Sequence, residues 1–229
     1  MDNWERDIRD KHQLMTNIYH GTVPHDIFEW IKKIIWEKRR QQKQSATNHL
    51  IGHLTEEYFI KNRPSRTGER FVPDDNFIKY ESFISNCCLA KPLDNLWESN
   101  QFLDEDREIV IDTSWVNFQK KYEFNPPHIH SGLFSWIIFV KIPYDLKNEE
   151  NYFLSDHLTQ TSKLNFLYPK PIFHGGRGDV GHTVLNVDKS YEGKILVFPA
   201  ELMHSVNPFY TSDEYRITVS GNVIFKVTN

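Results

Sequence analysis

The stretch NPPHIHSGLFSWIIFVKIP, residues 125–143, places two histidines immediately before an apolar run. The segment FSWIIFVK is short and rich in aromatic and β-branched residues, which is typical of a buried β-strand. His128 and His130 are two residues apart, and side chains at that spacing point to the same face of a strand. Because neutral histidine is the commonest metal ligand, both imidazoles could bind one metal ion. On this motif alone, two loop histidines with ordinary hydrogen bonds are the alternative.

The segments that follow residue 96 have the composition of further strands. They are short, rich in aromatic and β-branched residues, and separated by Pro, Gly, Asn and Asp. No helix of useful length is predicted among them except within 145–165, and 144–181 is predicted to be a long irregular connection. A series of short strands favours a jelly roll with helices outside it. The predicted strands are REIVID (107–112), SWVNFQKKYEF (114–124), FSWIIFVKIP (134–143), HTVLNVD (182–188), GKILVFPA (193–200), MHSVNPF (203–209) and YRITVSGNVIFKV (215–227).

The first hundred residues have a helical pattern. One apolar stripe with helical spacing follows Pro24, a residue suited to a first helical turn. Two further helices are predicted over 53–61 and 75–90. We therefore expect a mainly helical layer over 1–95, packed on a jelly-roll catalytic core over 96–229, with one structural domain overall. The stripe consists of Ile27, Phe28, Ile31, Ile34 and Ile35.

Composition and charge restrict the class of protein. A chain of 229 residues is long enough to bury a core without disulfides, and its two cysteines, Cys87 and Cys88, are adjacent. These features predict a reducing compartment. A net charge of -4 gives no support for a nucleic-acid partner or an anionic membrane surface. No apolar signal core and no apolar stretch of ~20 residues is present, so a cytoplasmic protein without a membrane span is expected. The oligomeric state is left open.

A second motif lies in EGKILVFPAELMHSVNPFYTSDEYRITVSGN, residues 192–222. His204 follows a predicted strand that ends at Pro199, and Arg216 lies in the next predicted strand with Thr218 on the same face. An arginine in an apolar strand costs several kcal/mol unless its charge is paired. A carboxylate is the natural partner for its guanidinium fork. The pattern predicts a metal held by the histidines, with a buried cation nearby for an acidic ligand.

These residues resemble the Fe(II)/2-oxoglutarate-dependent oxygenases, which have a double-stranded β-helix (jelly-roll) fold. The order Trp-x-Asn (SWVN), His-x-His, Gly…Phe-Pro, His and Arg is similar to a bacterial and phage branch of that superfamily. The resemblance covers 95–225 well and 45–95 loosely. For a phage-encoded protein, the compartment would be the host cytoplasm.

The resemblance implies a role for each matching residue. His128 would be the first iron ligand and His204 the distal one. Arg216 would bind the far carboxylate of 2-oxoglutarate, with the hydroxyl of Thr218 beside it, and Asn117 could face the cosubstrate. It also implies Fe(II), 2-oxoglutarate and O2 as cofactors and a hydroxylation of an unspecified small molecule or side chain. No catalytic residue beyond the metal ligands is expected.

His130 departs from the family pattern, because it stands where the usual triad has a carboxylate. We favour His130 itself as the third ligand. A distant acid such as Asp112 or Asp179, or a water molecule, is the alternative.

Two other classes of protein share some of these features with the oxygenases. A cupin shares the jelly roll and a His-x-His motif, but its acid after that motif is absent from SGLFSW, and Glu201 stands where a cupin has glycine. A cupin also has no need of Arg216 and Thr218. A metal-free binding module on an oxygenase-like scaffold is the third class.

Overall fold

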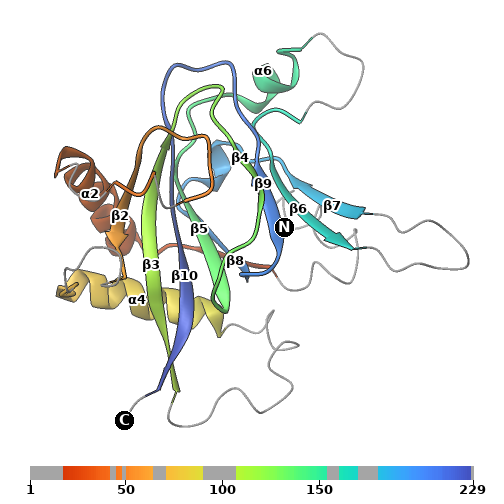
Figure 1. Ribbon diagram of the computed structural model, residues 1–229. Coiled ribbons are helices and arrows are strands. Elements are labelled where there is room, and N and C mark those ends of the chain that lie inside the picture. The colour runs from red at the N-terminus through yellow and green to blue at the C-terminus, as the bar shows by residue number, and fades with distance from the viewer. Residues whose placement is uncertain are drawn as a thin grey trace, which may run out of the picture.

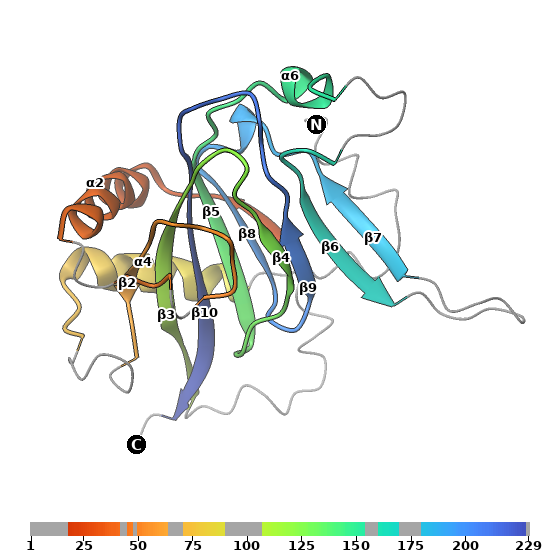
Figure 2. The ribbon, with the colours of Figure 1, turned by 45° about the horizontal axis from the view of Figure 1, so that its top comes forward.

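A computed structural model describes residues 18–41, 45–47, 50–63, 71–89, 107–153, 160–169 and 180–227. Its strands form two antiparallel sheets that face each other (Figures 1 and 2). The larger sheet has the order β1 (Tyr19–Thr22), β8 (Lys194–Pro199), β5 (Phe134–Lys141), β10 (Arg216–Val227), β3 (Arg107–Gln119) and β2 (Glu57–Lys61). The smaller sheet has the order β4 (Asn125–His128), β9 (Met203–Val206), β6 (Leu164–Pro169) and β7 (Val180–Leu185). The mainly β fold of two sheets is the one that the sequence predicts.

The helices lie on the outer face of the larger sheet, away from the smaller one (Figure 2). They are α2 (His25–Gln41) and α4 (Asp75–Cys88), which match two of the predicted helices. Asp74 caps α4, since its carboxylate accepts a hydrogen bond from the backbone N–H of Phe77 at 2.7 Å. A short helix, α6 (Leu146–Glu150), and a 3-10 turn (Lys189–Tyr191) complete the described elements. No helix in these ranges is long and apolar enough to cross a membrane.

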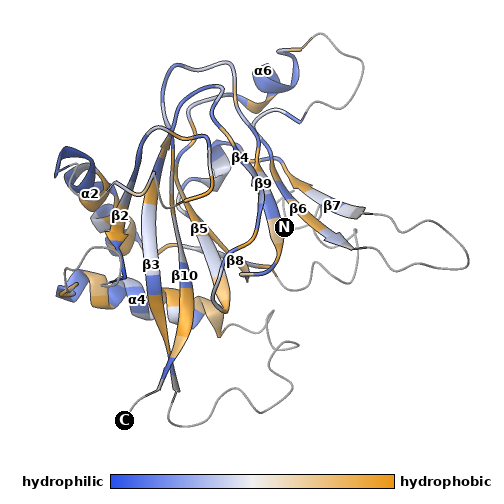
Figure 3. Ribbon diagram, in the orientation of Figure 1, coloured by the Kyte–Doolittle hydropathy of each residue, from blue (hydrophilic) through white to orange (hydrophobic). Residues whose placement is uncertain are grey.

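The larger sheet buries side chains on both faces. In β5, Trp136 and Ile138 pack with the helices, whereas Ile137 and Phe139 point between the two sheets. The same alternation in β10 sends Ile217 to the helix side, so that its neighbours on the strand face the interior between the sheets. In Figure 3, β3 and β10 are hydrophobic near one end and more polar toward the other. The polar part of these two strands holds the candidate site.

The predicted helix over 53–61 is wrong, because β2 (Glu57–Lys61) occupies its second half. Residues 57–60 are all buried, on both faces of the sheet, so the strand lacks the alternation that would have identified it. β1 was also missed, and both strands extend the main sheet from the N-terminal region. The connection over 144–181 is likewise less irregular than expected, since it contains α6 and β6. The predicted boundary at 95–96 lies outside the described residues.

Gly221, in the centre of β10, offers a test of how tightly this sheet is packed. A Cβ there would overlap the Trp136 ring and the backbone oxygen of Thr113. We expect Gly221→Ala to lower the free energy of unfolding by about 3 kcal/mol, because the Thr113 backbone oxygen cannot move aside. Denaturant unfolding measures the change.

Gly193→Ala is the matched control. A Cβ at Gly193 meets only Phe28, at 3.9 Å, but the residue has a φ of 79°. The expected loss is about 1 kcal/mol, from backbone conformation alone. Equal losses at the two glycines would contradict the steric explanation.

Candidate metal centre

Three histidines meet at one end of the space between the sheets. His128 on β4 pairs directly with His204 on β9, and their ring centroids are 4.3 Å apart. His130 lies two residues beyond His128, with its ring 4.8 Å from that of His128 and 5.1 Å from that of His204. One ring nitrogen from each histidine lies within 4.8 Å of the others. This is a separation at which three imidazoles can share one metal ion.

Two of these rings are oriented by their own strands. The Nδ1–H of His128 donates to the backbone oxygen of Pro126 at 2.7 Å, and that of His204 donates to the backbone oxygen of Leu202 at 2.9 Å. A proton held on Nδ1 leaves Nε2 with a free lone pair. Such hydrogen bonds to the second ring nitrogen are the usual way in which proteins orient metal-binding histidines.

His130 is held differently. Its backbone N–H donates to the backbone oxygen of Ala200 at 2.9 Å, in the turn between β8 and β9. Its ring packs against Trp115, with centroids 5.6 Å apart. Among the described residues, no carbonyl orients its ring as in the other two histidines. His130 is therefore fixed by its backbone and by ring packing.

Burial keeps all three imidazoles neutral. It lowers the pKa of His204 to about 4 and that of His130 to about 3, and the nearby histidines add to both shifts. Burial also lowers the pKa of His128, against an opposing effect of its hydrogen bond to Pro126. Neutral imidazole is the form that binds metals. At neutral pH the cluster is thus ready to bind a cation.

No carboxylate belongs to this cluster in the part of the chain that the structure describes. Asp112, one alternative ligand, pairs instead with the guanidinium of Arg63, with Nε 2.8 Å from Oδ1. Asp179, the other, lies outside the described residues. Three neutral imidazole nitrogens suit a divalent ion such as Fe(II), so the residues present fit the metal that the resemblance implies.

Arg216 lies buried in the same pocket, with 3% of its surface exposed. All five of its N–H groups have acceptors. Nε and Nη2 both donate to Oε1 of Gln119, at 2.9 and 2.7 Å. Nη1 donates to the Tyr144 hydroxyl at 3.1 Å and to the Ser162 backbone oxygen at 2.8 Å, and Nη2 also donates to the Asn207 backbone oxygen at 2.8 Å. Every acceptor is neutral, so the described structure pairs this buried cation with no anion.

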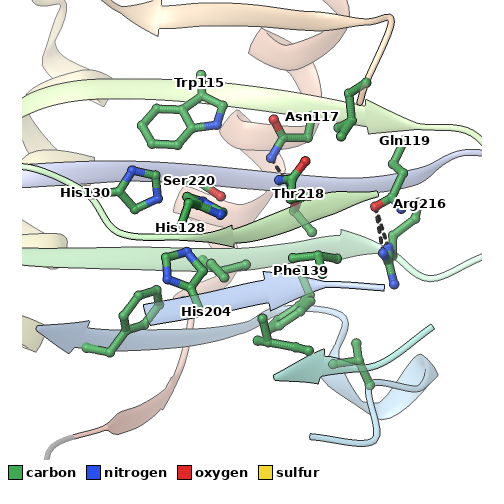
Figure 4. Close-up of a pocket in the computed structure, with 17 residues that line it drawn as sticks. Trp115, Asn117, Gln119, His128, His130, Phe139, His204, Arg216, Thr218 and Ser220 are labelled. Atoms are coloured by element: carbon green, nitrogen blue, oxygen red, sulfur yellow. Dashed lines mark hydrogen bonds between the residues drawn. The ribbon is translucent and has the colours of Figure 1, made fainter. Parts of the chain in front are cut away.

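The pocket runs from the histidines to Arg216 (Figure 4). The Asn117 and Thr218 side chains lie between these two ends, and Nδ2 of Asn117 donates to Oγ1 of Thr218 at 3.3 Å. None of the described residues that line the pocket is an aspartate or a glutamate. A pocket whose one permanent charge is positive favours an anionic ligand.

Gln119 is a pocket residue that the sequence analysis did not single out. It follows Trp115 and Asn117 at intervals of two on β3, and all three line the pocket. The strand alternation could have identified it. The backbone acceptors at Ser162 and Asn207 have no sequence signal, because any residue supplies a carbonyl group.

Part of the chain matches a known family. Residues 113–222 match a family described as "Putative 2OG-Fe(II) oxygenase". No curated protein matched the chain. Residues 113–222 are therefore a 2OG-Fe(II) oxygenase domain.

Several solved structures are similar to this chain. A prolyl-4-hydroxylase from Pseudomonas putida is 10% identical with a TM-score of 0.51, covering 90% of this chain and 91% of its own. This likeness agrees with the predicted double-stranded β-helix. A 2OG-Fe(II) oxygenase family oxidoreductase from Burkholderia pseudomallei is 13% identical, with a TM-score of 0.41 and coverage of 92% and 88%. A Trichoplax adhaerens prolyl hydroxylase, in complex with a hypoxia inducible factor peptide fragment, is 14% identical, with a TM-score of 0.47 and coverage of 96% and 92%.

The lowered histidine pKa values predict a pH-dependent stability of the metal-free protein. A histidine with a folded pKa of about 4 stays neutral where the unfolded chain binds a proton, so stability is lost as the pH falls below about 6.5. For His204 this loss between pH 7 and pH 5 is about 2 kcal/mol. Denaturant unfolding of the parent and of His204→Ala at both pH values measures it.

Comparing the parent with His204→Ala separates the contribution of His204 to the pH dependence of stability from the contributions of other titrating groups. Glu57, for example, acts in the opposite direction, because burial raises its pKa to about 7 and its protonation stabilises the folded state as the pH falls. The variant should therefore lose about 2 kcal/mol less than the parent between the two pH values. An identical pH dependence in both proteins would contradict a buried neutral His204.

Proposed function

We propose that this chain is an Fe(II)- and 2-oxoglutarate-dependent oxygenase in which His128, His130 and His204 hold the iron. Arg216 binds the far carboxylate of 2-oxoglutarate, with Thr218 and Asn117 beside it. The observation that carries the proposal is the pocket itself. It joins a cluster of three neutral imidazoles to a buried guanidinium that has no acidic partner among the described residues.

The bound cofactors would supply the redox chemistry by which O2 oxidises 2-oxoglutarate to succinate and carbon dioxide and hydroxylates a substrate. The protein's own residues bind and orient the cosubstrate and shield the pocket from water. Arg216 offers a cation at the end of the pocket opposite the histidines, where a carboxylate accepts charge-assisted hydrogen bonds. Oγ1 of Thr218 already accepts a hydrogen bond from Asn117, so its own hydroxyl proton is free to point at the same carboxylate.

Most of the remaining pocket wall is apolar. It would pack against the methylene groups of 2-oxoglutarate and keep water away from the reacting groups. This wall includes Ile137, Phe139, Leu164, Val187, Phe198 and Val206.

The third imidazole changes the charge of the site. A site of two histidines and one carboxylate contributes one negative charge, whereas three neutral histidines contribute none. The pocket is therefore one unit more positive around a divalent ion, which strengthens its preference for an anionic cosubstrate. We propose His130 as the third ligand because its ring lies with the other two and no acid among the described residues joins the cluster.

Metal binding tests the ligand assignment. The parent protein should bind about one Fe(II) or Co(II) ion per chain, and His128→Ala or His204→Ala should abolish stoichiometric binding. His130→Ala should weaken binding less, because its ring lacks the carbonyl contact that orients the other two. His130→Asp should bind more tightly than the parent, because it adds a negative ligand. Anaerobic calorimetry measures all four variants.

His182→Ala is the control for this series. His182 is exposed on β7, outside the cluster, and its removal should leave the metal affinity unchanged. Retention of stoichiometric metal by the His128→Ala/His204→Ala double variant would refute the site.

Cosubstrate binding tests the function. With Fe(II) and ascorbate in air, the protein should release succinate from 2-oxoglutarate. Arg216→Ala should weaken 2-oxoglutarate binding by about 3–5 kcal/mol, several hundred-fold or more, while metal affinity stays near that of the parent. Arg216→Lys should recover only part of the loss, since an ammonium group cannot form the bidentate fork.

The control is Lys121→Ala, which removes a cation that pairs with the exposed Asp213 outside the pocket. It should bind 2-oxoglutarate as the parent does. Metal binding without any 2-oxoglutarate affinity would favour a cupin, and the absence of both would favour a metal-free binding module.

A further inference from the structure

The two Arg216 nitrogens that would form a bidentate contact with a carboxylate already have a hydrogen-bond partner. Nε and Nη2, the two nitrogens that form a bidentate contact with a carboxylate, both donate to the single amide oxygen of Gln119. The guanidinium has five N–H groups, and all five donate hydrogen bonds, to four acceptor atoms, so it has none to spare for another partner. A carboxylate can bind the fork only if Gln119 gives up its contact.

Gln119 is also the most replaceable of the acceptors. The Ser162 and Asn207 oxygens belong to the backbone, and Tyr144 is a buried core residue with its ring against Phe209. Gln119 reaches Arg216 with a side chain that can change rotamer. It also lines the same face of the pocket as Asn117 (Figure 4).

The other end of the Gln119 amide ties it to the turn after β3. Its Nε2 donates to the backbone oxygen of Glu123 at 2.5 Å. The Glu123 carboxylate in turn accepts hydrogen bonds from the backbone N–H and the hydroxyl of Thr55, at 3.1 and 2.7 Å, beside the pocket residue Leu54. The amide therefore stays correctly oriented, with its oxygen toward Arg216.

We propose that Gln119 is a positioning residue that holds Arg216 in the cosubstrate-free enzyme and releases its fork to the far carboxylate of 2-oxoglutarate. Gln119 thereby sets the affinity for the cosubstrate. The inference rests on the proposed function and deepens it. A charged carboxylate replaces a neutral amide oxygen in this exchange, and charge-assisted hydrogen bonds are roughly twice as strong as neutral ones.

The proposal predicts opposite effects of two substitutions. Gln119→Ala removes the competing acceptor, so 2-oxoglutarate should bind about tenfold more tightly. Gln119→Glu places a carboxylate in the fork, and the resulting internal ion pair should weaken 2-oxoglutarate binding at least about a hundredfold. Titration of the Mn(II)-loaded protein with 2-oxoglutarate measures both. Metal affinity, measured in parallel, should change in neither variant.

Tyr144→Phe is the matched control. It deletes one neutral acceptor of Arg216 on Nη1, outside the fork, and should change the affinity for 2-oxoglutarate less than about threefold. A second readout is the side-chain amide signal of Gln119 in a nitrogen-15 spectrum, identified by its absence from Gln119→Ala. This signal should shift when 2-oxoglutarate saturates the parent protein.

The outcomes separate the two proposals. Weaker binding by Gln119→Ala would make Gln119 a direct cosubstrate contact and overturn the exchange. Unchanged binding by both Gln119 variants, with binding lost in Arg216→Ala, would overturn the exchange and leave the proposed function standing. No 2-oxoglutarate binding by the parent or by Gln119→Ala would overturn the proposed function, and the exchange with it.

Discussion

The structure depends on the two-residue alternation of β3 and β10, which run antiparallel side by side from Arg216 opposite Gln119 to Val227 opposite Arg107. Over residues 115–119 and 216–220, alternate residues pack with the helices, and the residues between them line the pocket. A register slip of one residue would turn Arg216 toward α2 and bury Ile217 among polar groups. Helix packing and pocket chemistry are therefore fixed by the same backbone register.

Charge is distributed along the pocket in a way that the alternation alone does not determine. One end holds neutral nitrogen donors, the other holds a permanent cation, and the described lining contains no acid. Dipoles of amide, hydroxyl and carbonyl groups satisfy the cation without neutralising it. The metal-free protein thus carries an unbalanced positive charge in its interior, a cost that binding of an anion would relieve.

Much of this arrangement could be predicted from the sequence, because it follows from local patterns. The fold class, the two long helices and the burial of Arg216 rest on strand alternation and helical spacing. The meeting of His128 with His204 is what the resemblance to the oxygenases implies. β2 could not be predicted, since its residues 57–60 are buried on both faces and show no alternation. The neutral partners of Arg216 could not be predicted either, because two of them are backbone carbonyl groups from distant loops.

The hydrogen bonds that orient His128 and His204 come from the carbonyl groups of Pro126 and Leu202, each two residues earlier on the same chain segment. Proteins often use a distant side chain for this purpose, which ties the metal site to other parts of the sequence. Here the orientation of each ring is fixed by the same short chain segment that carries the histidine. The rest of the pocket could therefore diverge during evolution, and accept new substrates, without compensating changes that keep these two histidines in place.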